Sequence, residues 1–313
     1  MGSYARTMHL GIFARIAETL GPLGAQISVH DRRERDFEGG RRAAADYADG
    51  HLHIIENGRV RAPGVLNAAL SYIQPYFHLD PRGVLAESSI AQRAYDPASL
   101  PAGSAGAFLE QMRQRLVIPR KSRHQQSEAV QAVPPGCLAV FLQGQWTLNR
   151  GLAFVPPHEM LRAVAIGAQG RAVLAKPHPL ALEHDLAAIA QVQAEGFDVQ
   201  PSTANLHDIL AACAATVSFN SAVALEGYLH GKPTVLFGPS DFHHIADTVR
   251  DPSEFPAALA RALTRDPGGY ARYMQWYFSR QCLNIRGAQF VPRVLRIFAN
   301  AGFPADRLGL TLR

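Results

Sequence analysis

Lys176-Pro177-His178-Pro179 is the segment of the sequence whose residue types offer the clearest chemistry. It directly follows the apolar run 172–175, which we expect to be a strand. Two prolines restrict the backbone of the histidine, because proline fixes its own φ and limits the residue before it. A cation and an imidazole held rigidly at the carboxyl end of a strand suit a phosphate or a leaving group, and the imidazole can donate a proton. A rigid loop with a solvent-exposed lysine is the alternative.

A second polar cluster, Ser218-Phe219-Asn220-Ser221, ends the predicted strand 215–219 and opens a predicted helix at 222–230. Asn220 or Ser221 can cap this helix, and a helix N-terminus with free N–H groups and hydroxyls binds anions readily. Capping alone would explain a lone serine. Because the cluster belongs to the same sheet as the histidine segment, we favour a phosphate site.

Acidic residues of the first half are weaker candidates. Glu56-Asn57-Gly58-Arg59-Val60-Arg61 follows the predicted strand 51–55. A carboxylate beside two arginines can act as an acid or base or bind an anion, but a salt-bridged turn would look the same. Asp80 and Glu87 leave the same choice open, and for each the structural interpretation is favoured.

Other chemistries have little support. Ser240-Asp241-Phe242-His243-His244 pairs two histidines with one aspartate, but no second ligand cluster accompanies it, so we expect no metal and no cofactor. The sequence contains no dinucleotide-binding fingerprint, Walker loop, Gly-x-Ser-x-Gly or His-Glu-x-x-His. Its aromatic residues are not interleaved with arginines, so we expect no nucleic-acid partner.

The elements that must position these residues change character near Val133-Pro134-Pro135-Gly136, which predicts domains at 1–134 and 135–313. The first part predicts helices at 9–20 and 107–117, strands at 25–29, 51–55 and 76–79, and a small, flexible segment at 102–107. The second part predicts strands at 137–142, 172–175, 197–199, 215–219 and 234–237, with helices at 157–167, 182–195, 206–212 and 222–230 between them. This alternation indicates a parallel, doubly wound sheet, whose ligands bind at the carboxyl ends of its strands. The tail after residue 251 is expected to be helical and to be able to cross back to the first domain.

Composition bounds the class of protein. The 313 residues are 47% hydrophobic, which suits two globular domains. The three cysteines are far apart, no run of about 18 apolar residues exists and the first residues do not resemble a secretion signal, so we expect a cytoplasmic protein. The formal net charge of +5 fits nucleic acid, an anionic membrane surface or a phosphate-bearing ligand. Lysine is rare among the 31 basic residues, and Lys176 and Lys232 both fall in motifs.

These segments together resemble the capsule polysaccharide biosynthesis family, whose characterised members are bacterial β-Kdo transferases. The segments that carry the resemblance are Lys176–Pro179, Val217–Pro233, Ile55–Arg61, Tyr76–Val84 with Ser88-Ser89, and Phe141-Leu142-Gln143. They agree in kind, order and approximate spacing over about residues 50–245. The stretch 76–89 looks closer to the members that add the first Kdo to a lipid anchor.

The resemblance implies an α/β protein of the GT-B class, with two Rossmann-like doubly wound domains facing across a cleft. It implies a glycosyltransferase that moves an acidic sugar, Kdo, from a CMP-activated donor to a lipid or glycan acceptor in capsule or surface polysaccharide synthesis. His178 and Glu56 would be catalytic, the latter as acid or base toward the acceptor. The donor would be bound by Lys176, His178, Pro179, Ser218, Asn220, Ser221, Gln143 and Glu226, while Arg61 and Asp80 would contact the acceptor or an anion. The arginine-rich segments 31–42 and 113–123 would hold the enzyme at the anionic inner face of the membrane.

One departure from the family pattern leaves the mechanism open. Family members place an aspartate shortly after the Leu-Gln motif, whereas this chain has Gln145 and Thr147 there and no carboxylate between residues 143 and 150. An amide or hydroxyl cannot replace a carboxylate nucleophile without a base to activate it. The nucleophile is therefore supplied differently, the stereochemistry or donor differs, or activity is lost. A non-catalytic nucleotide-binding protein and a transferase for another nucleotide sugar are the alternatives.

Overall fold

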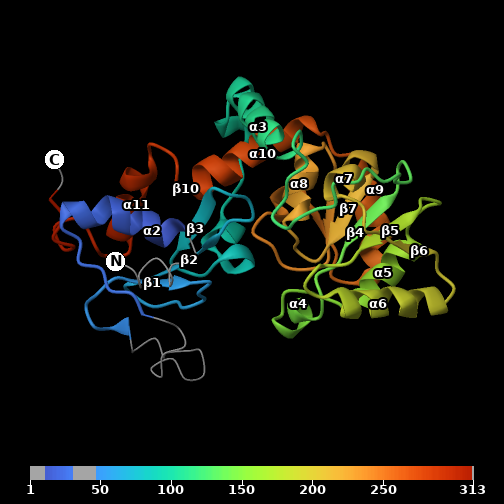
Figure 1. Ribbon diagram of the computed structural model, residues 1–313, viewed down its shortest axis with the longest axis horizontal. Helices are drawn as coiled ribbons and strands as arrows, with labels where there is room; N and C mark the ends of the chain where they lie inside the picture. The colour runs from blue at the N-terminus through green and yellow to red at the C-terminus, as the bar shows by residue number, and fades with distance from the viewer. Residues whose placement is uncertain (1–10, 31–46, 312–313) are drawn as a thin grey trace. The chain divides into compact units, whose positions relative to one another are not determined.

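The computed structural model describes residues 11–30 and 47–311; residues 1–10, 31–46 and 312–313, which include the whole predicted arginine-rich segment 31–42, lie outside that description. The chain divides into two compact units (Figure 1). Unit 1 comprises Met1–Arg93 and Phe278–Arg313, and unit 2 comprises Ala94–Tyr277. The chain thus passes between the units after residues 93 and 277, whereas the sequence predicts a single boundary near residue 135.

Unit 1 contains a four-stranded sheet of order β1-β2-β3-β10. Its elements are α2 (Gly11–Leu20), β1 (His53–Glu56), β2 (Val65–Leu70), β3 (Tyr76–Asp80), β10 (Leu283–Asn284) and α11 (Phe290–Asn300). Only β1 and β2 are parallel; β3 is antiparallel to both β2 and β10. The predicted strand at 25–29 does not form, because Ile27 and Val29 are exposed there and have no core to cover. Strand β2 was not predicted.

Alternation along the strands of unit 1 separates an apolar face from a polar one. Leu66 of β2 and Phe77 of β3 pack with α2 and α11 in one core cluster. The intervening side chains, Asn67, His78 and Asp80, are buried as well. Because they point to the opposite face, they meet the loops that follow β1 and β3, where several predicted site residues lie.

Unit 2 is built on a six-stranded sheet of order β6-β5-β4-β7-β8-β9, and every neighbouring pair is parallel. The strands are β4 (Leu138–Phe141), β5 (Val173–Lys176), β6 (Val199–Pro201), β7 (Ala215–Ser218), β8 (Thr234–Leu236) and β9 (Asp247–Thr248). The helices are α3 (Ala102–Leu116), α4 (Trp146–Asn149), α5 (Pro157–Ile166), α6 (Leu182–Ala194), α7 (Leu206–Ala212), α8 (Val223–Leu229), α9 (Phe255–Leu263) and α10 (Gly268–Gln275). Of the five strands predicted from residue 137 onward, four are confirmed, and the one expected at 197–199 lies instead at Val199–Pro201.

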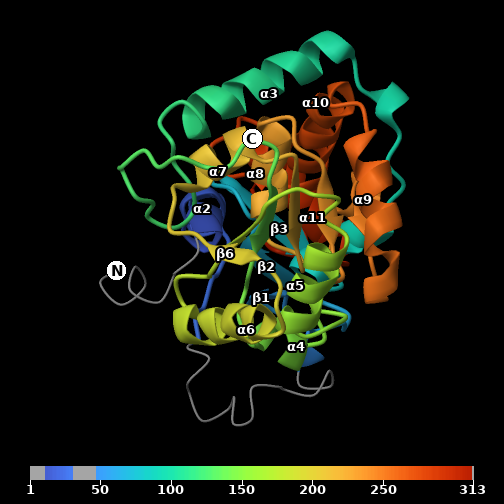
Figure 2. The same ribbon diagram turned by 90° about the vertical axis from the view of Figure 1, so that its right-hand side faces the viewer.

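Helices cover both faces of this sheet (Figure 2). Leu138 and Val140 of β4 belong to one core cluster with residues of α5, α6 and α9. Their neighbours Ala139 and Phe141 belong to another cluster with residues of α7. Since successive side chains of a strand point to opposite faces, this alternation defines a three-layer α/β unit.

The packing of α3 and of the C-terminal elements explains why the chain passes between the units after residues 93 and 277. Helix α3 packs on α10 within unit 2, with Ala105 and Met112 almost fully buried. The predicted flexible segment at 102–107 was therefore wrong, since these small residues form the first turns of α3. At the other end of the chain, β10 pairs with β3 and α11 joins the core of unit 1, so the final helix does return to the first unit. None of the helices in residues 11–30 and 47–311 is long and apolar enough to cross a membrane.

Candidate functional site

The carboxyl ends of β4 and β7 meet at the point where the strand order of unit 2 reverses (Figure 1). Strands β5 and β6 lie on one side of β4, and β7, β8 and β9 lie on the other. Open α/β sheets bind ligands outside such a reversal. Gln143 follows β4 and Asn220 follows β7, so two residues predicted to bind a donor nucleotide lie at this edge.

The amides of Gln143 and Asn220 are engaged with each other. Gln143 Nε2 donates to Asn220 Oδ1 at 3.1 Å, and the backbone N–H of Asn220 donates to Gln143 Oε1 at 3.1 Å. Asn220 Nδ2 also donates to the carbonyl oxygens of Leu152 and Pro239, at 2.9 and 3.0 Å. Their amide groups therefore join the loops after β4, β7 and β8.

The serines of the same cluster shape the entry to α8. Ser218 is buried, and its Oγ accepts from the backbone N–H of Ser221 at 3.2 Å. Ser221 Oγ in turn accepts from the N–H of Val223 at 3.3 Å. Both hydroxyls satisfy N–H groups of the turn before the helix. The N-cap itself is Ala222, so neither Asn220 nor Ser221 caps α8 as the sequence predicts.

Lys176 is the last residue of β5 and lies at the same edge of the sheet. Its Nζ donates to the carbonyl oxygen of Ala204 at 2.6 Å. Burial lowers the pKa of the ammonium group. An ammonium has three donors, so two remain for another acceptor.

His178 is half-buried two residues beyond β5, and its tautomer follows from its contacts. Its Nδ1 accepts from the backbone N–H of Leu180 at 3.2 Å, so a neutral ring carries its proton on Nε2. Burial lowers the pKa of His178, and the nearby His124 and Arg123 lower it further. The ring is thus a neutral Nε2–H donor near pH 7. Pro179 beside it is exposed.

Asp185, in the first turn of α6, is a fully buried carboxylate that sequence reasoning missed. Oδ1 accepts from the backbone N–H of Gly144 at 3.0 Å, and Oδ2 accepts from that of His178 at 2.8 Å. Asp185 therefore fixes the loops after β4 and β5 together. Burial raises the pKa of this carboxyl, against the hydrogen bonds that lower it. Only its place seven residues after His178 hints at this role.

Residues 119–128, which we call the strap, hold several polar contacts in unit 2. Ser122 Oγ donates to Glu226 Oε1 at 2.9 Å, and burial raises the pKa of Glu226 to about 7. Glu226 Oε2 is buried without a hydrogen-bond partner, 3.9 Å from Nε2 of the buried His207. His207 Nε2 donates instead to the Lys121 carbonyl oxygen at 2.9 Å. Glu226, predicted to bind the donor, is therefore 4% exposed and covered by the strap.

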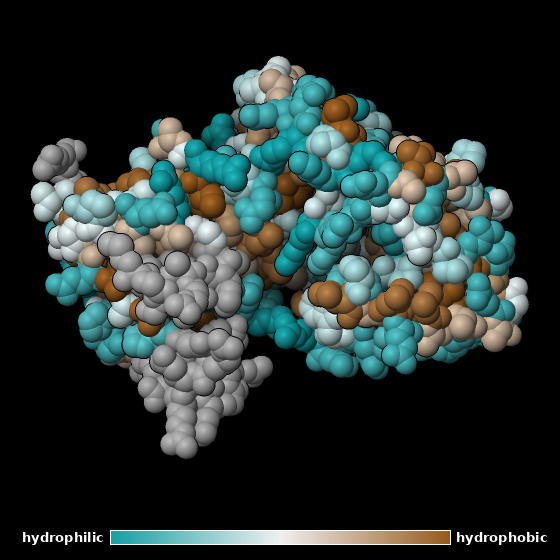
Figure 3. All heavy atoms as spheres, viewed as in Figure 1, coloured by the Kyte–Doolittle hydropathy of each residue, from teal (hydrophilic) through white to brown (hydrophobic). Residues whose placement is uncertain are grey.

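An exposed apolar group borders the loops fixed by Asp185. Gly144 has a φ of +69°, and a Cβ there would lie 2.7 Å from the Cβ of Ala181, so the loops after β4 and β5 approach closely. Beside them Trp146 is 44% exposed, and the exposed leucines of this region are Leu180, Leu182 and Leu186. Brown side chains gather over α4 and α6 in Figure 3.

The candidates of unit 1 lie in the loops after β1 and β3. Asp80 is buried, and its carboxylate accepts from the backbone N–H groups of Arg82 and Ser89, at 2.8 and 2.9 Å, and from the hydroxyl of Ser89. It therefore organises its own loop. Arg61 Nε donates to the carbonyl oxygen of Arg82 at 3.2 Å. Glu56 ends β1 and is partly exposed.

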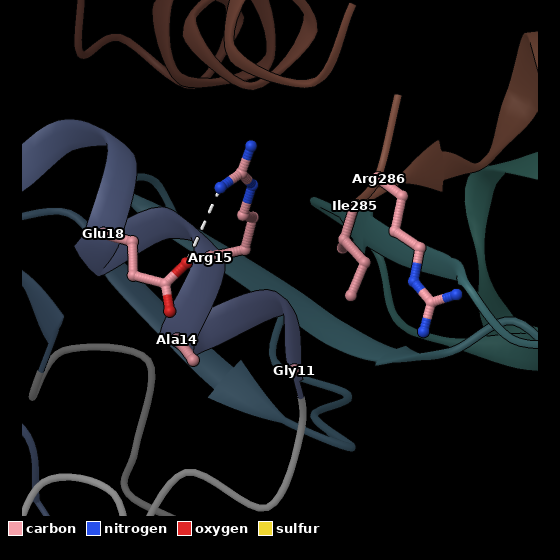
Figure 4. A pocket seen from close by; sticks show the side chains of 6 residues that line it. All are labelled: Gly11, Ala14, Arg15, Glu18, Ile285 and Arg286. Carbon is pink, nitrogen blue, oxygen red and sulfur yellow. Dashed lines mark ion pairs between the residues drawn. The ribbon is translucent and has the colours of Figure 1, made fainter. Parts of the chain in front are cut away.

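A hollow of about 370 Å³ elsewhere in unit 1 contains none of the predicted site residues (Figure 4). It is lined by Gly11, Ala14, Arg15, Glu18, Ile285 and Arg286. Arg15 pairs with Glu18 at 3.6 Å, one turn further along α2. This ion pair balances one of the two arginines, so the lining keeps a formal charge of +1.

The chemical capacity of the unit 2 site follows from these contacts. Lys176 and the Nε2–H of His178 offer hydrogen-bond donors to a phosphate oxygen, on loops fixed by Asp185 and the Gln143–Asn220 pair. The segment that lacks the family aspartate offers no nucleophile in its place. Thr147 is fully buried and its hydroxyl donates to the Gly144 carbonyl oxygen at 3.0 Å, while Gln145 is exposed but neutral.

Comparisons with known proteins bear on the fold. No family model matches the sequence, and no curated protein matches it. Among solved structures, the chain is similar to the β-Kdo 2,7 transferase of KpsC from Thermosulfurimonas dismutans, with a TM-score of 0.51 and 13% identity over 85% of this chain and 87% of that one. It also matches the β-Kdo 2,4 transferase of the same KpsC, with a TM-score of 0.44 and 14% identity over 68% and 72% of the two chains.

The first of these likenesses shows the fold, and the fold class is GT-B, as the motifs predict. The resemblance to capsule β-Kdo transferases is confirmed at this level. At 13% identity, the likeness does not extend to substrates or to the roles of single residues.

Proposed function

We propose that the chain is a glycosyltransferase whose nucleotide-sugar donor binds at the carboxyl edge of unit 2. The observation that supports this most is the position of His178, a neutral Nε2–H donor held by Asp185 beside the point where the strand order reverses. A leaving phosphate gains negative charge as its bond to the sugar breaks, and a fixed donor stabilises that charge. Lys176 supplies a positive charge at the same edge.

The donor we propose is CMP-Kdo and the acceptor a lipid or glycan at the anionic inner membrane surface. The motif resemblance to β-Kdo transferases supports this choice over other nucleotide sugars. In this scheme the acceptor hydroxyl attacks the anomeric carbon, Glu56 takes its proton, and CMP leaves with the bonding electrons. Arg61 faces an anionic group of the donor or acceptor. No metal or cofactor takes part, because CMP is a good leaving group.

A nucleotide panel in a thermal-shift assay, followed by incubation with CMP-Kdo and a phosphatidylglycerol-type acceptor, tests this function. We expect CMP to raise the melting temperature more than UMP or GMP, and CMP to be released during turnover. Glu56→Gln should bind CMP as the wild type does and lose turnover. Stabilisation by another nucleotide alone would replace Kdo by a different sugar.

A non-catalytic nucleotide-binding protein is the second candidate, and a specific observation favours it. The segment 143–150 offers no carboxylate, and the carboxylate that does contact its Gly144, that of Asp185, is fully buried and bound by two backbone N–H groups. Stabilisation by CMP without turnover of any donor would establish this candidate.

A further inference from the structure

The strap is anchored on both sides of Arg123 and His124. Before them, Arg120 pairs with Asp208 at 2.6 Å and Ser122 bonds to Glu226. After them, Gln126 Oε1 accepts from the backbone N–H of Leu206 at 3.0 Å, and the Ser127 carbonyl oxygen accepts from Asn205 Nδ2 at 2.8 Å. The three residues between these anchors, Arg123, His124 and Gln125, are therefore held in place.

The anchors bring His124 against the candidate donor loop. The His124 ring meets the ring of His178 edge to face, with centroids 5.2 Å apart. Lys176 reaches the same neighbourhood, because it bonds to Ala204, which directly precedes the strap's anchor at Asn205. Burial lowers the pKa values of both histidines, and the exposed Arg123 lowers them further.

This group of bases lacks a counter-charge within the described residues. Asp208 pairs with Arg120, and Asp185 accepts from two backbone N–H groups. Burial raises the pKa of Glu226 to about 7, which weakens it as a counter-charge. Arg123 forms no ion pair with any carboxylate that the structure describes. An anion that binds here would gain a charge-assisted hydrogen bond from the Arg123 guanidinium and neutral donors from the imidazole rings.

We propose that Arg123 and His124 of the strap form, with His178, a binding site for a phosphate group. The inference rests on the proposed function only for the identity of the ligand, which would then be the phosphate of the donor nucleotide. The strap would thus contribute to the donor site a cation and an imidazole that lie more than fifty residues before the histidine segment. Arg123, with its planar guanidinium, is suited to bidentate contact with phosphate oxygens.

Inorganic phosphate, followed by NMR of the histidine rings, tests the site without any turnover. We expect the His124 and His178 signals, assigned with His124→Gln and His178→Gln, to shift together in one titration. Arg123→Gln should weaken phosphate binding at least about fivefold, since a charge-assisted contact is lost. Arg171→Gln is the matched control: it removes the same charge just before β5, at the opposite edge of the sheet, and should bind phosphate within twofold of the wild type.

Either of two results overturns the inference: phosphate leaves both rings unperturbed, or Arg123→Gln binds it as tightly as the wild type does. Titrations with CMP and cytidine identify the group recognised, because Arg123→Gln should weaken CMP binding and leave cytidine binding unchanged. An equal loss for both ligands would likewise overturn the phosphate assignment. If the wild type turns over CMP-Kdo and Arg123→Gln binds phosphate as tightly as the wild type does, the proposed function stands and the strap has no part in phosphate binding. If the strap binds phosphate but the protein turns over no donor, the phosphate site stands and the proposed function fails.

Discussion

The side chains of Gln143 and Asn220 hydrogen-bond to each other across the carboxyl ends of β4 and β7. The pair lies where a donor nucleotide is expected, yet both amides satisfy groups of the protein itself. Their contribution is therefore to keep three loops in register. Side chains directed inward in this way set the shape of a site without contacting its ligand.

Replacing Gln143 tests this role. Gln143→Leu leaves the backbone N–H and the Oδ1 of Asn220 without partners, so we expect the free energy of unfolding to fall by about 1–3 kcal/mol. Gln145→Leu, at an exposed position two residues away, should change it by less than about 0.5 kcal/mol. Chemical denaturation measures both, and equal stability of the two variants would contradict the pairing.

Asp185 should affect both stability and ligand binding. Asp185→Asn keeps one acceptor but turns an amide N–H₂ toward the other backbone N–H, so one loop is released. We expect a loss of about 1–3 kcal/mol in unfolding free energy and weaker CMP binding. Asp198→Asn, at an exposed site after α6, is the control. Chemical denaturation and calorimetric titration with CMP measure the two effects. An unchanged CMP affinity would mean that Asp185 has no role in ligand binding.

Glu226 should make stability depend on pH. Because burial raises its folded-state pKa to about 7, above the ordinary 4.5, its contribution is fully present below pH 4.5 and is lost as the pH rises through 7. Glu226→Gln mimics the neutral acid, so its stability relative to the wild type should rise between pH 5 and 8, by up to about 3 kcal/mol.

His230 should make the free energy of unfolding depend on pH below about 6.5. Burial lowers its pKa to about 4, so its contribution is lost as the pH falls from 6.5 through 4 in both proteins. Urea unfolding at several pH values separates the two effects. A constant difference between Glu226→Gln and the wild type from pH 5 to 8 would mean that Glu226 is ionised throughout.

His178 should be required for turnover in its neutral form. His178→Ala should abolish turnover and leave the melting temperature within a few degrees of that of the wild type. Because the pKa of His178 lies below its ordinary 6.5, the rate should be flat above that pH and fall at lower pH, where protonation of Nδ1 breaks the bond from Leu180. An active His178→Ala variant would remove the residue from the mechanism.

The stereochemistry of the product should follow from the missing carboxylate. With no nucleophile between residues 143 and 150, we expect a single displacement by the acceptor, which inverts the anomeric configuration of the donor sugar. NMR of the purified product against the donor measures this. Retention would show that a carboxylate outside this segment forms a covalent intermediate.

The sheet of unit 2 could be predicted from the sequence because each strand is a short apolar run followed by turn residues, with a helix of regular period after it. Strand β2 could not, since its Asn67 and two alanines break the apolar run. Helix α3 opens with Ala-Gly-Ser-Ala-Gly-Ala, a sequence of low apparent order. Packing against α10 buries Ala105 and stabilises these turns, and sequence periodicity does not show such a contact.

Some residues of the candidate site could likewise be predicted from the sequence, and others could not. Lys176 and His178 were predicted because they directly follow a strand. Asp185 and the strap were missed because their roles depend on contacts between distant residues: Asp185 reaches Gly144, 41 positions earlier, and Ser122 reaches Glu226, 104 positions later. The sequence shows residue types at strand ends, and only the folded chain shows which of them bind each other.

The intrinsic fluorescence of Trp146 can report on the candidate donor site. The chain has two tryptophans, and Trp276 is 6% exposed, whereas Trp146 is 44% exposed next to Gly144 and the loop that carries His178. A change in this loop on ligand binding would alter the solvent around one indole and leave the other in its core. The unlabelled protein thus carries an intrinsic fluorophore beside the candidate donor site, suited to rapid-mixing measurements.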